Sequence, residues 1–373
     1  MKEKIAHIRL RYLRNTETFI YEEVTGVKKY DPLVFCIDTA NLDVFPFSGV
    51  RSLSSLSPAS YAFNAASWMW LKRCPYFERL IRDEGVALLH AQYGREGLFS
   101  IKMKENCGVP LITNFQGWDA STIPKKEPHI YDRLFKAGDR FIAKSADMKK
   151  DLIGFGCPEE KIVIHHQGID LEKFKFSERL PVSAGENVNI LMICRFVETK
   201  GIPYAVEAFA KASKSHPNME MTVIGDGILR LQIEDMVKQL GLEGKIKLTG
   251  YVPHERLIYE LKRAHIFIQP SITDSKGEKE GTTTTIPEAQ AMGIPAIGTY
   301  HAGIPEALVD GKSGFLVKEK DVDALAEKLN FLIEHQELWK ELGVNGRKHV
   351  EKEFNTVVQS RKLEDIYTKL LNR

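Results

Sequence analysis

The chain has 373 residues, of which 43% are hydrophobic and 27% charged, and its formal net charge is +2. This length exceeds the usual size of one compact domain, so we expect two domains. The nearly balanced charge argues against a dedicated nucleic-acid binder, which carries a strong basic excess. Residues 1–180 hold 27 Lys and Arg against 23 Asp and Glu. This mild excess either suits an anionic acceptor or membrane surface, or is scattered solvated charge.

The sequence shows neither a signal peptide nor an apolar run long enough to span a bilayer. We therefore expect a cytoplasmic protein, with the inner face of the membrane as a further location. The odd number of cysteines and the lack of a CxxC pair predict reduced thiols rather than disulfides. Neither the cysteines nor the histidines follow a metal-binding pattern, so no metal and no cofactor is expected. The cysteines are Cys36, Cys74, Cys107, Cys157 and Cys194.

Short apolar runs alternate with segments of helical period along the chain, which is typical of parallel α/β structure. Strands are expected at residues 4–10, 32–37, 86–90, 109–113, 140–143, 162–166, 188–193, 220–224, 245–249, 265–269, 295–298 and 315–317. Helices are expected at residues 202–215, 228–240, 255–263, 286–292, 321–334 and 355–373. Two Rossmann-like sheets account for this pattern better than one sheet of twelve strands.

The polar segment 173–187, with its Pro, Ser and Gly residues, marks the expected break between the domains. We predict an N-terminal domain over 1–180, a C-terminal domain over 181–354 and a closing helix over 355–373. Two such domains facing each other leave a cleft at the carboxyl ends of their strands, where open α/β sheets bind ligands. The loops must then identify the ligand, because the fold alone does not.

The segment 279–293 (KEGTTTTIPEAQAMG) carries the first chemical signal. Thr285 followed by Glu288 predicts a capping box, so a purely structural role for Glu288 stays open. The amides of Thr283 and Thr284 would form a phosphate cradle at the helix start. A capping box does not explain Glu280. An acid beside a phosphate cradle favours binding of sugar hydroxyls attached to that phosphate.

Two cations in CRFVETKG, Arg195 and Lys200, follow the strand 188–193 at the expected cleft end of the sheet. Together they could clamp a diphosphate, and alone they could be ordinary solvated loop cations. The run VIGDG places Gly225 in a tight strand-to-helix turn, but Arg230 replaces the third glycine of a dinucleotide fingerprint. We therefore interpret Gly225 as part of a nucleotide-binding turn rather than as a dehydrogenase signature.

Two loops of the first half also follow predicted strands and are expected on the acceptor side of the cleft. They are 15–19, with Glu17, and 116–119, with Gln116 and Asp119. The aromatic run 61–71 ends at Lys72 and Arg73 and is interpreted as a helix covering the N-terminal sheet. An acceptor lid or a helix resting on a membrane are the alternatives.

Beyond these separate signals, the chain resembles the family 4 retaining glycosyltransferases of the GT-B fold, and in particular members that build bacterial exopolysaccharides of the colanic-acid type. The carrying motifs are RFVETKG, VIGDG, GYVPHERL, EAQAMGIPAI preceded by Glu280, HAGIPEALVDGKSGFLV, HAQYGREG and FQGWD. The resemblance implies that Arg195 and Lys200 neutralise the donor diphosphate and that Glu280 holds the transferred sugar. Glu288 would bind the ribose, and the loop at Val252 would contact the base. The closing helix 355–373 would cross back to pack on the N-terminal domain.

Three positions depart from the family pattern. Gln116 stands where relatives often have a histidine, which removes an imidazole from the N-terminal cleft loop. Cys194 stands where many have glycine, and four threonines at 282–285 replace apolar residues. The expected reaction moves a sugar from a nucleoside diphosphate to a glycan or lipid-linked hydroxyl with retention and without a metal.

Three other functions remain as alternatives. A glycoside hydrolase would use Glu280 and Glu288 as a carboxylate pair about 5 to 9 Å apart, but would leave Arg195 and Lys200 without a task. A nucleotide-sugar epimerase on the same fold would need no acceptor. A two-domain sugar-binding protein would catalyse no reaction at all.

Overall fold

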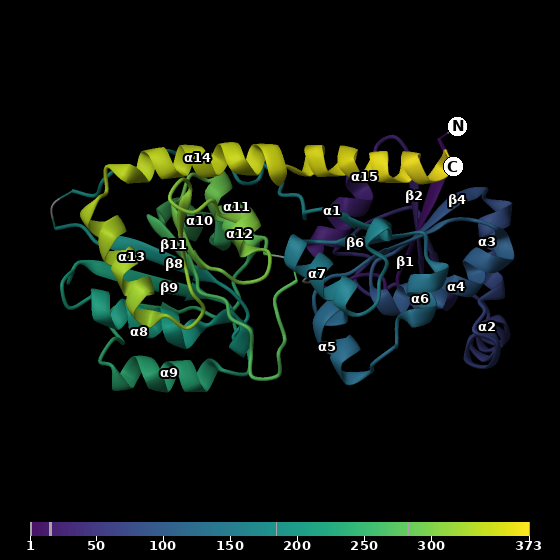
Figure 1. Cartoon of the computed structure of the whole chain (residues 1–373), viewed down its shortest axis with the longest axis horizontal. Helices are drawn as coiled ribbons and strands as arrows, with labels where there is room; N and C mark the ends of the chain where they lie inside the picture. The colour runs from purple at the N-terminus through teal and green to yellow at the C-terminus, as the bar shows by residue number, and fades with distance from the viewer. Residues whose placement is uncertain (1, 15–16, 184, 282, 373) are drawn as a thin grey trace. The chain divides into compact units, whose positions relative to one another are not determined.

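A computed structural model describes residues 2–14, 17–183, 185–281 and 283–372. The chain forms two compact units, one of residues 1–168 with 356–373 and one of residues 169–355. Each unit is a parallel α/β sheet flanked by helices (Figure 1). Among the described residues no helix is long and apolar enough to cross a membrane. Asn15, Thr16 and Thr282, which belong to expected loops, lie outside the described residues.

The first unit contains a seven-stranded sheet in the order β3-β2-β1-β4-β5-β6-β7. Its strands are β1 (Lys4–Ile8), β2 (Asp31–Cys36), β3 (Val50–Ser52), β4 (Val86–Ala91), β5 (Leu111–Asn114), β6 (Arg140–Ala143) and β7 (Ile162–Ile164). All six strands expected in this half are present, and β3 was not predicted. This edge strand has only three residues, too few to show an apolar period.

Helices connect the parallel strands of this unit, except between β2 and β3, where residues 37–49 form no helix. They are α1 (Thr18–Gly26), α2 (Pro58–Leu71), α3 (Pro75–Asp83), α4 (Gly94–Cys107), α5 (Trp118–Lys126), α6 (Asp132–Ala137) and α7 (Ala146–Gly154). The C-terminal helix α15 (Thr356–Leu371) joins the same unit, as expected. Its residues Leu363 and Tyr367 pack in one core with Ile5 and Leu88 of the sheet.

The second unit contains a six-stranded parallel sheet in the order β10-β9-β8-β11-β12-β13. Its strands are β8 (Val188–Ile193), β9 (Met219–Ile224), β10 (Ile246–Leu248), β11 (Ile266–Gln269), β12 (Ala296–Thr299) and β13 (Gly314–Val317). Its helices are α8 (Ile202–Ala212), α9 (Arg230–Gln239), α10 (His254–Arg263), α11 (Thr285–Ala291), α12 (Ile304–Ala307), α13 (Val322–Glu334) and α14 (Leu338–Glu353). The six strands expected here are all confirmed.

The division between the units falls at Gly168, twelve residues before the expected break at 180. The segment after Gly168 packs on the second unit, where Ile169 and Phe174 belong to the same apolar core as Leu191 of β8. Arg179 donates from Nη2 to the carbonyl oxygen of Leu261 at 3.0 Å. The polar composition of 173–187 predicted a linker. The burial of Phe174 and Arg179 instead places its first half in the second unit.

Candidate active site

In each unit the chain order reverses at the centre of the sheet, between β1 and β4 in the first and between β8 and β11 in the second. Parallel α/β sheets bind ligands at the carboxyl ends of the two strands that flank such a reversal. In the second unit, Arg195 and Lys200 follow β8, and Ser271 follows β11. The predicted donor residues therefore lie where the topology itself places a binding site.

Lys200 and Glu280, which are 80 positions apart in the sequence, form an ion pair in which Lys200 Nζ lies 2.5 Å from Glu280 Oε2. The Glu280 side chain is 3% exposed and that of Lys200 16%. Glu280 also accepts hydrogen bonds from the Ser271 hydroxyl and from Gln269 Nε2 at 3.3 Å. Glu280 thus has structural partners, which contradicts the expectation that only a ligand would account for it.

The Glu280 carboxyl is ionised in spite of its burial. Burial alone would raise its pKa, but the charge and hydrogen bond of Lys200, with the bond from Ser271, hold the pKa below its ordinary value. An ionised carboxylate with hydrogen-bonding neighbours can accept further bonds from hydroxyl groups. This chemistry suits sugar hydroxyls and excludes contact with a bare phosphate oxygen at the same atoms.

Lys200 is held in place by a backbone contact that only glycine permits. It ends the 3₁₀ turn η3 (Glu198–Lys200), and the next residue, Gly201, has φ +64°. A Cβ at Gly201 would lie 1.9 Å from the carbonyl oxygen of Pro270, just after β11. The loop after β8 therefore packs directly on the loop after β11, which carries Lys200 to Glu280.

Two further glycines position Arg195. Gly225 has φ +130°, and a Cβ there would lie 1.8 Å from the carbonyl oxygen of Cys194. Gly227 is packed in the same way on the backbone of Phe196. The predicted tight turn at Gly225 thus braces the two neighbours of Arg195, and the Arg195 side chain itself is exposed. Within the described part of the chain, no ion pair of Arg195 is found.

Cys194, the residue before Arg195, is buried. Burial is the main influence on its thiol and raises its pKa to about 12, so the thiol stays protonated. A buried protonated thiol acts as a small apolar side chain, so Cys194 contributes packing beneath the loop that carries Arg195.

His301, which follows β12, supports Glu280 through the backbone. The buried ring of His301 accepts the backbone N–H of Glu280 at Nε2 (3.1 Å) and donates from Nδ1 to Glu319 Oε1 (2.7 Å). Glu319 in turn accepts the Thr273 amide at 2.8 Å. This chain of bonds ties three loops together. Sequence could not find it because its members lie 18 to 46 positions apart.

The expected capping box at α11 is wrong. The N-cap is Thr284 rather than Thr285, and its side chain makes no capping hydrogen bond. Thr285 instead donates from its hydroxyl to Gln269 Oε1 at 2.5 Å. Glu288 is the fourth helical residue, one position beyond the one that a capping box uses, because Pro287 occupies that place. The Thr285 hydroxyl therefore binds β11 rather than the start of its own helix.

The other predicted donor residues surround this helix start. Thr283 lies beside Glu280, with its hydroxyl 3.5 Å from Glu280 Oε2, and Thr284 precedes the first turn. Glu288 is partly buried in that turn, and Val252 packs against the core of the unit. The backbone N–H groups of a first helical turn lack intrahelical partners, so the predicted phosphate cradle remains a prediction at this position.

In the first unit, Glu17 is bound to the protein rather than exposed. Arg9 donates to Glu17 Oε2 at 2.7 Å, Tyr93 donates to Glu17 Oε1 at 3.0 Å, and Arg9 also pairs with buried Glu96. Arg9 follows β1 and Tyr93 follows β4, so this network occupies the reversal point of the first sheet. Its bonds tie the loop of Glu17, which the sequence assigned to the acceptor side, to the residues after β4.

Asp119 is likewise buried, and it accepts the backbone N–H groups of Gly94, Gln116 and Gly117 at 2.8 to 3.1 Å. Burial is the main influence on its carboxyl and raises its pKa. Asp119 therefore shapes the loop after β5 instead of facing a ligand. The amide side chain of Gln116, by contrast, has both polar atoms buried without a hydrogen-bond partner among the described residues.

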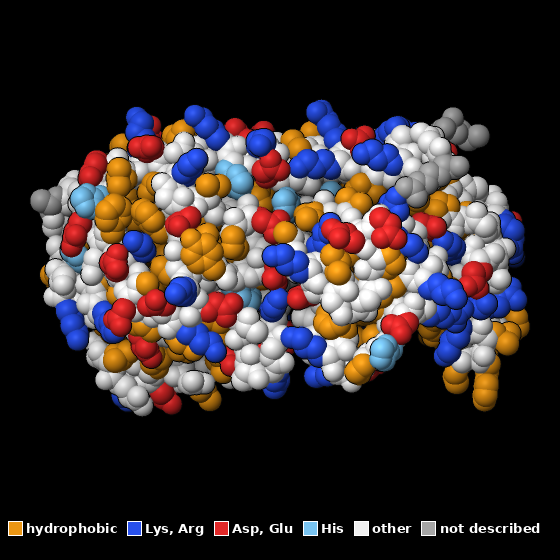
Figure 2. Space-filling model, viewed as in Figure 1, with side chains coloured by type: hydrophobic (Ala, Val, Ile, Leu, Met, Phe, Trp, Pro, Cys, Tyr) orange, Lys and Arg blue, Asp and Glu red, His pale blue; other side chains and the backbone are white. Residues whose placement is uncertain are grey.

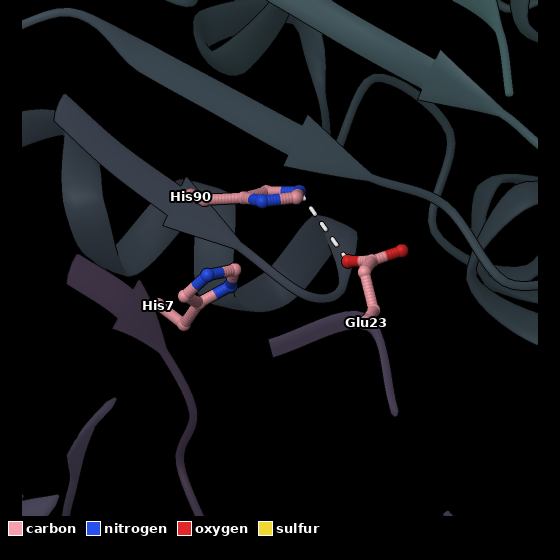
Figure 3. A group of neighbouring side chains, drawn as sticks. All are labelled: His7, Glu23 and His90. Atoms are coloured by element: carbon pink, nitrogen blue, oxygen red, sulfur yellow. Dashed lines mark ion pairs between the residues drawn. The ribbon is translucent and has the colours of Figure 1, made fainter. Parts of the chain in front are cut away.

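One group of side chains in the first unit brings together potential metal ligands, His7, Glu23 and His90 (Figure 3). The pairing of β1 with β4 sets His7 opposite His90, which no sequence spacing could show. The buried ammonium group of Lys144 lies 3.1 Å from Glu23 Oε2, and Gln92 and Asn114 donate to Oε1. With the carboxylate engaged by an ammonium and two amides, the donor set fits a buried ion pair better than a metal.

Two family models match the chain, one described as Glycosyl transferases group 1 over residues 174–349 and one as Glycosyltransferase Family 4 over residues 28–173. The amylovoran biosynthesis glycosyltransferase AmsK of Erwinia amylovora is 34% identical over 289 residues, which are 76% of this chain and 70% of AmsK. WcaL of Escherichia coli (strain K12) is 31% identical over 283 residues, 74% of this chain and 69% of WcaL.

Solved structures show the same fold. HepE of Anabaena in complex with UDP superposes with a TM-score of 0.76 at 16% identity, covering 99% of this chain and 100% of HepE. A glycosyltransferase from Rickettsia africae gives a TM-score of 0.77 at 20% identity, with 99% of each chain covered. At these identities the likeness shows only a common architecture of two Rossmann-like units. The chemistry has to be argued from the residues of this chain.

Proposed function

This chain belongs to the family of group 1 glycosyltransferases, and we propose that it transfers a sugar from a nucleoside diphosphate sugar to an acceptor hydroxyl with retention of the anomeric configuration. The observation that carries the proposal is the Lys200–Glu280 ion pair at the strand reversal of the second unit, beside the exposed Arg195. At this position a cation that can bind a diphosphate, Lys200, contacts an ionised carboxylate that can bind sugar hydroxyls, Glu280.

The proposed chemistry is mainly electrostatic. The bond between the sugar and the diphosphate breaks as negative charge develops on the departing phosphate, and Arg195 and Lys200 are available to stabilise that charge. When the diphosphate binds, Lys200 must either leave Glu280 or contact both groups at once. Glu280 then accepts hydrogen bonds from the sugar hydroxyls in place of the bond from Lys200. Two such cations can serve without a metal, so we propose a metal-independent reaction.

We propose a glycan or lipid-linked acceptor in the synthesis of a cell-surface polysaccharide. The name of AmsK, an amylovoran biosynthesis glycosyltransferase, supports this class of product. A UDP sugar is the first donor to test, because HepE was solved with UDP. On the acceptor side, Glu17 and Asp119 are engaged within the protein, whereas the buried amide of Gln116 has no partner among the described residues, so we propose that it binds the acceptor once the loop admits one.

Thermal stabilisation by nucleoside diphosphates and their sugar conjugates tests the donor. The melting temperature of wild type should rise, whereas Arg195→Ala and Lys200→Ala should each lose most of the shift. Lys211→Ala is the matched control, because Lys211 is a cation on α8 that pairs only with exposed Asp323 among the described residues. An equal shift in all four proteins would refute the phosphate assignment.

Transfer itself is measured with a short soluble acceptor. Free nucleoside diphosphate should appear only when the acceptor is present, which separates transfer from epimerisation. The coupling constant of the product's anomeric proton should show the donor's configuration, and an inverted product would refute retention. Activity should persist in excess chelator, and a loss that added divalent cation restores would refute metal independence.

A further inference from the structure

Helix α2 (Pro58–Leu71) is built with its polar and apolar faces reversed. Its buried residues are Asn64 and Ser67, whereas Phe63, Met69 and Trp70 are 62%, 63% and 80% exposed. These three side chains, with Ala62 and Ala66, recur at the three- and four-residue spacing of one helical face. A helix that only covers a sheet would bury this face, so the predicted covering role does not explain it.

The reversed orientation is fixed by specific contacts on the buried side. Asn64 accepts the backbone N–H of Tyr76 at 2.9 Å and donates to the carbonyl oxygen of Ser60 at 2.8 Å. Trp68 packs on Phe99 of α4 with its ring centroid 4.1 Å away. The inner side of α2 is therefore fixed by its own contacts. Rotating the helix to bury the apolar face would break them.

The charge nearest this face is basic. Arg73 is paired with buried Glu78 and Arg51 with Glu84, so Lys72 is the cation that this face offers to a ligand. Helix α2 itself has no charged residue, and the whole stretch 44–77 contains no Asp or Glu, while Arg51, Lys72 and Arg73 are its charged residues. Lys72 and Arg73 follow the helix directly and are exposed. Figure 1 shows α2 at the periphery of the first unit, and Figure 2 shows apolar side chains there with basic ones beside them.

We propose that this face, Phe63, Met69 and Trp70 with Lys72, rests on an anionic lipid surface. Aromatic side chains on one face of a helix with cations at its end are the composition of helices that lie in the membrane interface. With 14 residues, α2 is about 21 Å long, shorter than the hydrocarbon core of about 30 Å, so it would lie along the surface. The positive charge of Lys72 at the end of the helix favours headgroups of net negative charge.

This inference deepens the proposed function, because a lipid-bound enzyme would meet a lipid-linked acceptor at the surface where that acceptor is held. It does not depend on the function for its test. Binding to vesicles can be measured without a donor or an acceptor, and transfer to a short soluble acceptor can be measured without vesicles.

The experiment compares co-sedimentation of the full chain with vesicles of phosphatidylglycerol and phosphatidylethanolamine, and with vesicles of phosphatidylcholine alone. Wild type should bind the anionic vesicles, and high salt should weaken this binding. The double variant Phe63→Ser/Trp70→Ser should lose at least about tenfold in partitioning, and Lys72→Gln about fivefold. Leu231→Ser/Leu240→Ser, on α9 and directly after it, removes two exposed leucines from the other unit and should bind as wild type.

Each result bears on the proposal. The proposal is overturned if wild type does not bind anionic vesicles. It is also overturned if the Phe63→Ser/Trp70→Ser variant binds them as strongly as wild type does. If light scattering shows that this variant converts a dimer into a monomer while vesicle binding persists, the face binds a second copy and the proposal is wrong. Unchanged transfer to the soluble acceptor should accompany the loss of vesicle binding, which shows that the variant is folded.

Discussion

Lys200 Nζ and Glu280 Oε2 lie 2.5 Å apart at the reversal point of the second sheet, so two groups proposed to bind opposite ends of one donor bind each other. The pair keeps a buried carboxylate ionised and a lysine oriented before any ligand arrives. A donor bearing both a diphosphate and a sugar can satisfy both partners, whereas a nucleoside diphosphate alone would leave Glu280 buried without its cation.

Replacing Glu280 by Gln should therefore separate binding from transfer. Lys200 would be released for the diphosphate, so affinity for nucleoside diphosphate should stay or increase, while kcat should fall by about 100-fold or more as the charged sugar contact is lost. Titration calorimetry with the diphosphate and turnover with the full donor measure the two effects. Glu243→Gln, at an exposed turn, should change neither. Equal losses of diphosphate affinity and kcat would contradict this division of roles.

The His301–Glu319 pair should act on Glu280 through its backbone. His301→Ala leaves the buried Glu280 amide without an acceptor, which costs about 1 to 3 kcal/mol of unfolding free energy, and should lower kcat about tenfold or more. Denaturant unfolding and turnover check the two effects. His335→Ala is the matched control, because His335 makes the same kind of contact with Glu337 on the surface. A kcat equal to that of wild type would show that His301 only stabilises the fold.

Replacing Gly201 by alanine should destabilise the protein more than the same replacement at a glycine of equal φ elsewhere. Gly201 and Gly241 have φ of +64° and +66°, but only Gly201 lies against another backbone, while a Cβ at Gly241 would meet nothing within 4 Å. Gly241→Ala should cost about 1 kcal/mol through the left-handed conformation. Gly201→Ala should cost more and should also abolish donor stabilisation by displacing Lys200. Thermal unfolding with and without nucleoside diphosphate tests both; similar behaviour of the two variants would contradict the packing argument.

The buried histidines of the first unit should make its stability depend on pH. Burial, aided by the charge of Lys144, lowers the pKa of His165 to about 4, below the value of about 6.5 in an unfolded chain. The native ring stays neutral while the unfolded one binds a proton, so this contribution is complete above about pH 6.5 and is lost as the pH falls toward 4.

His165→Gln should therefore flatten the dependence of the unfolding free energy on pH by up to about 1.4 kcal/mol per pH unit within that window. The difference from wild type is the quantity to measure, by denaturant unfolding at several pH values, because burial also raises the pKa of Glu96 to about 7, with the opposite effect on stability. His129→Gln, at an exposed position, should leave the slope unchanged. A parallel pH profile for His165→Gln would contradict the prediction.

The sequence by itself determined the two sheets, twelve of their thirteen strands and the loops that carry the donor residues. These features depend on local information: apolar runs mark buried strands, and motifs such as RFVETKG place Arg195 and Lys200 directly after one. The strand that was missed, β3, has too few residues to show a period.

Only the tertiary structure decided which of the predicted side chains are free. Glu17 is engaged by Tyr93 and Asp119 by the amide of Gly94, both after β4, and Glu280 is engaged by Lys200 after β8; each of these partners comes from another loop. The order of strands decides which loops become neighbours, and no spacing along the chain contains that order. The exposed face of α2 could not be predicted either. The sequence of an apolar helix does not show whether its apolar face packs against the protein or points to solvent.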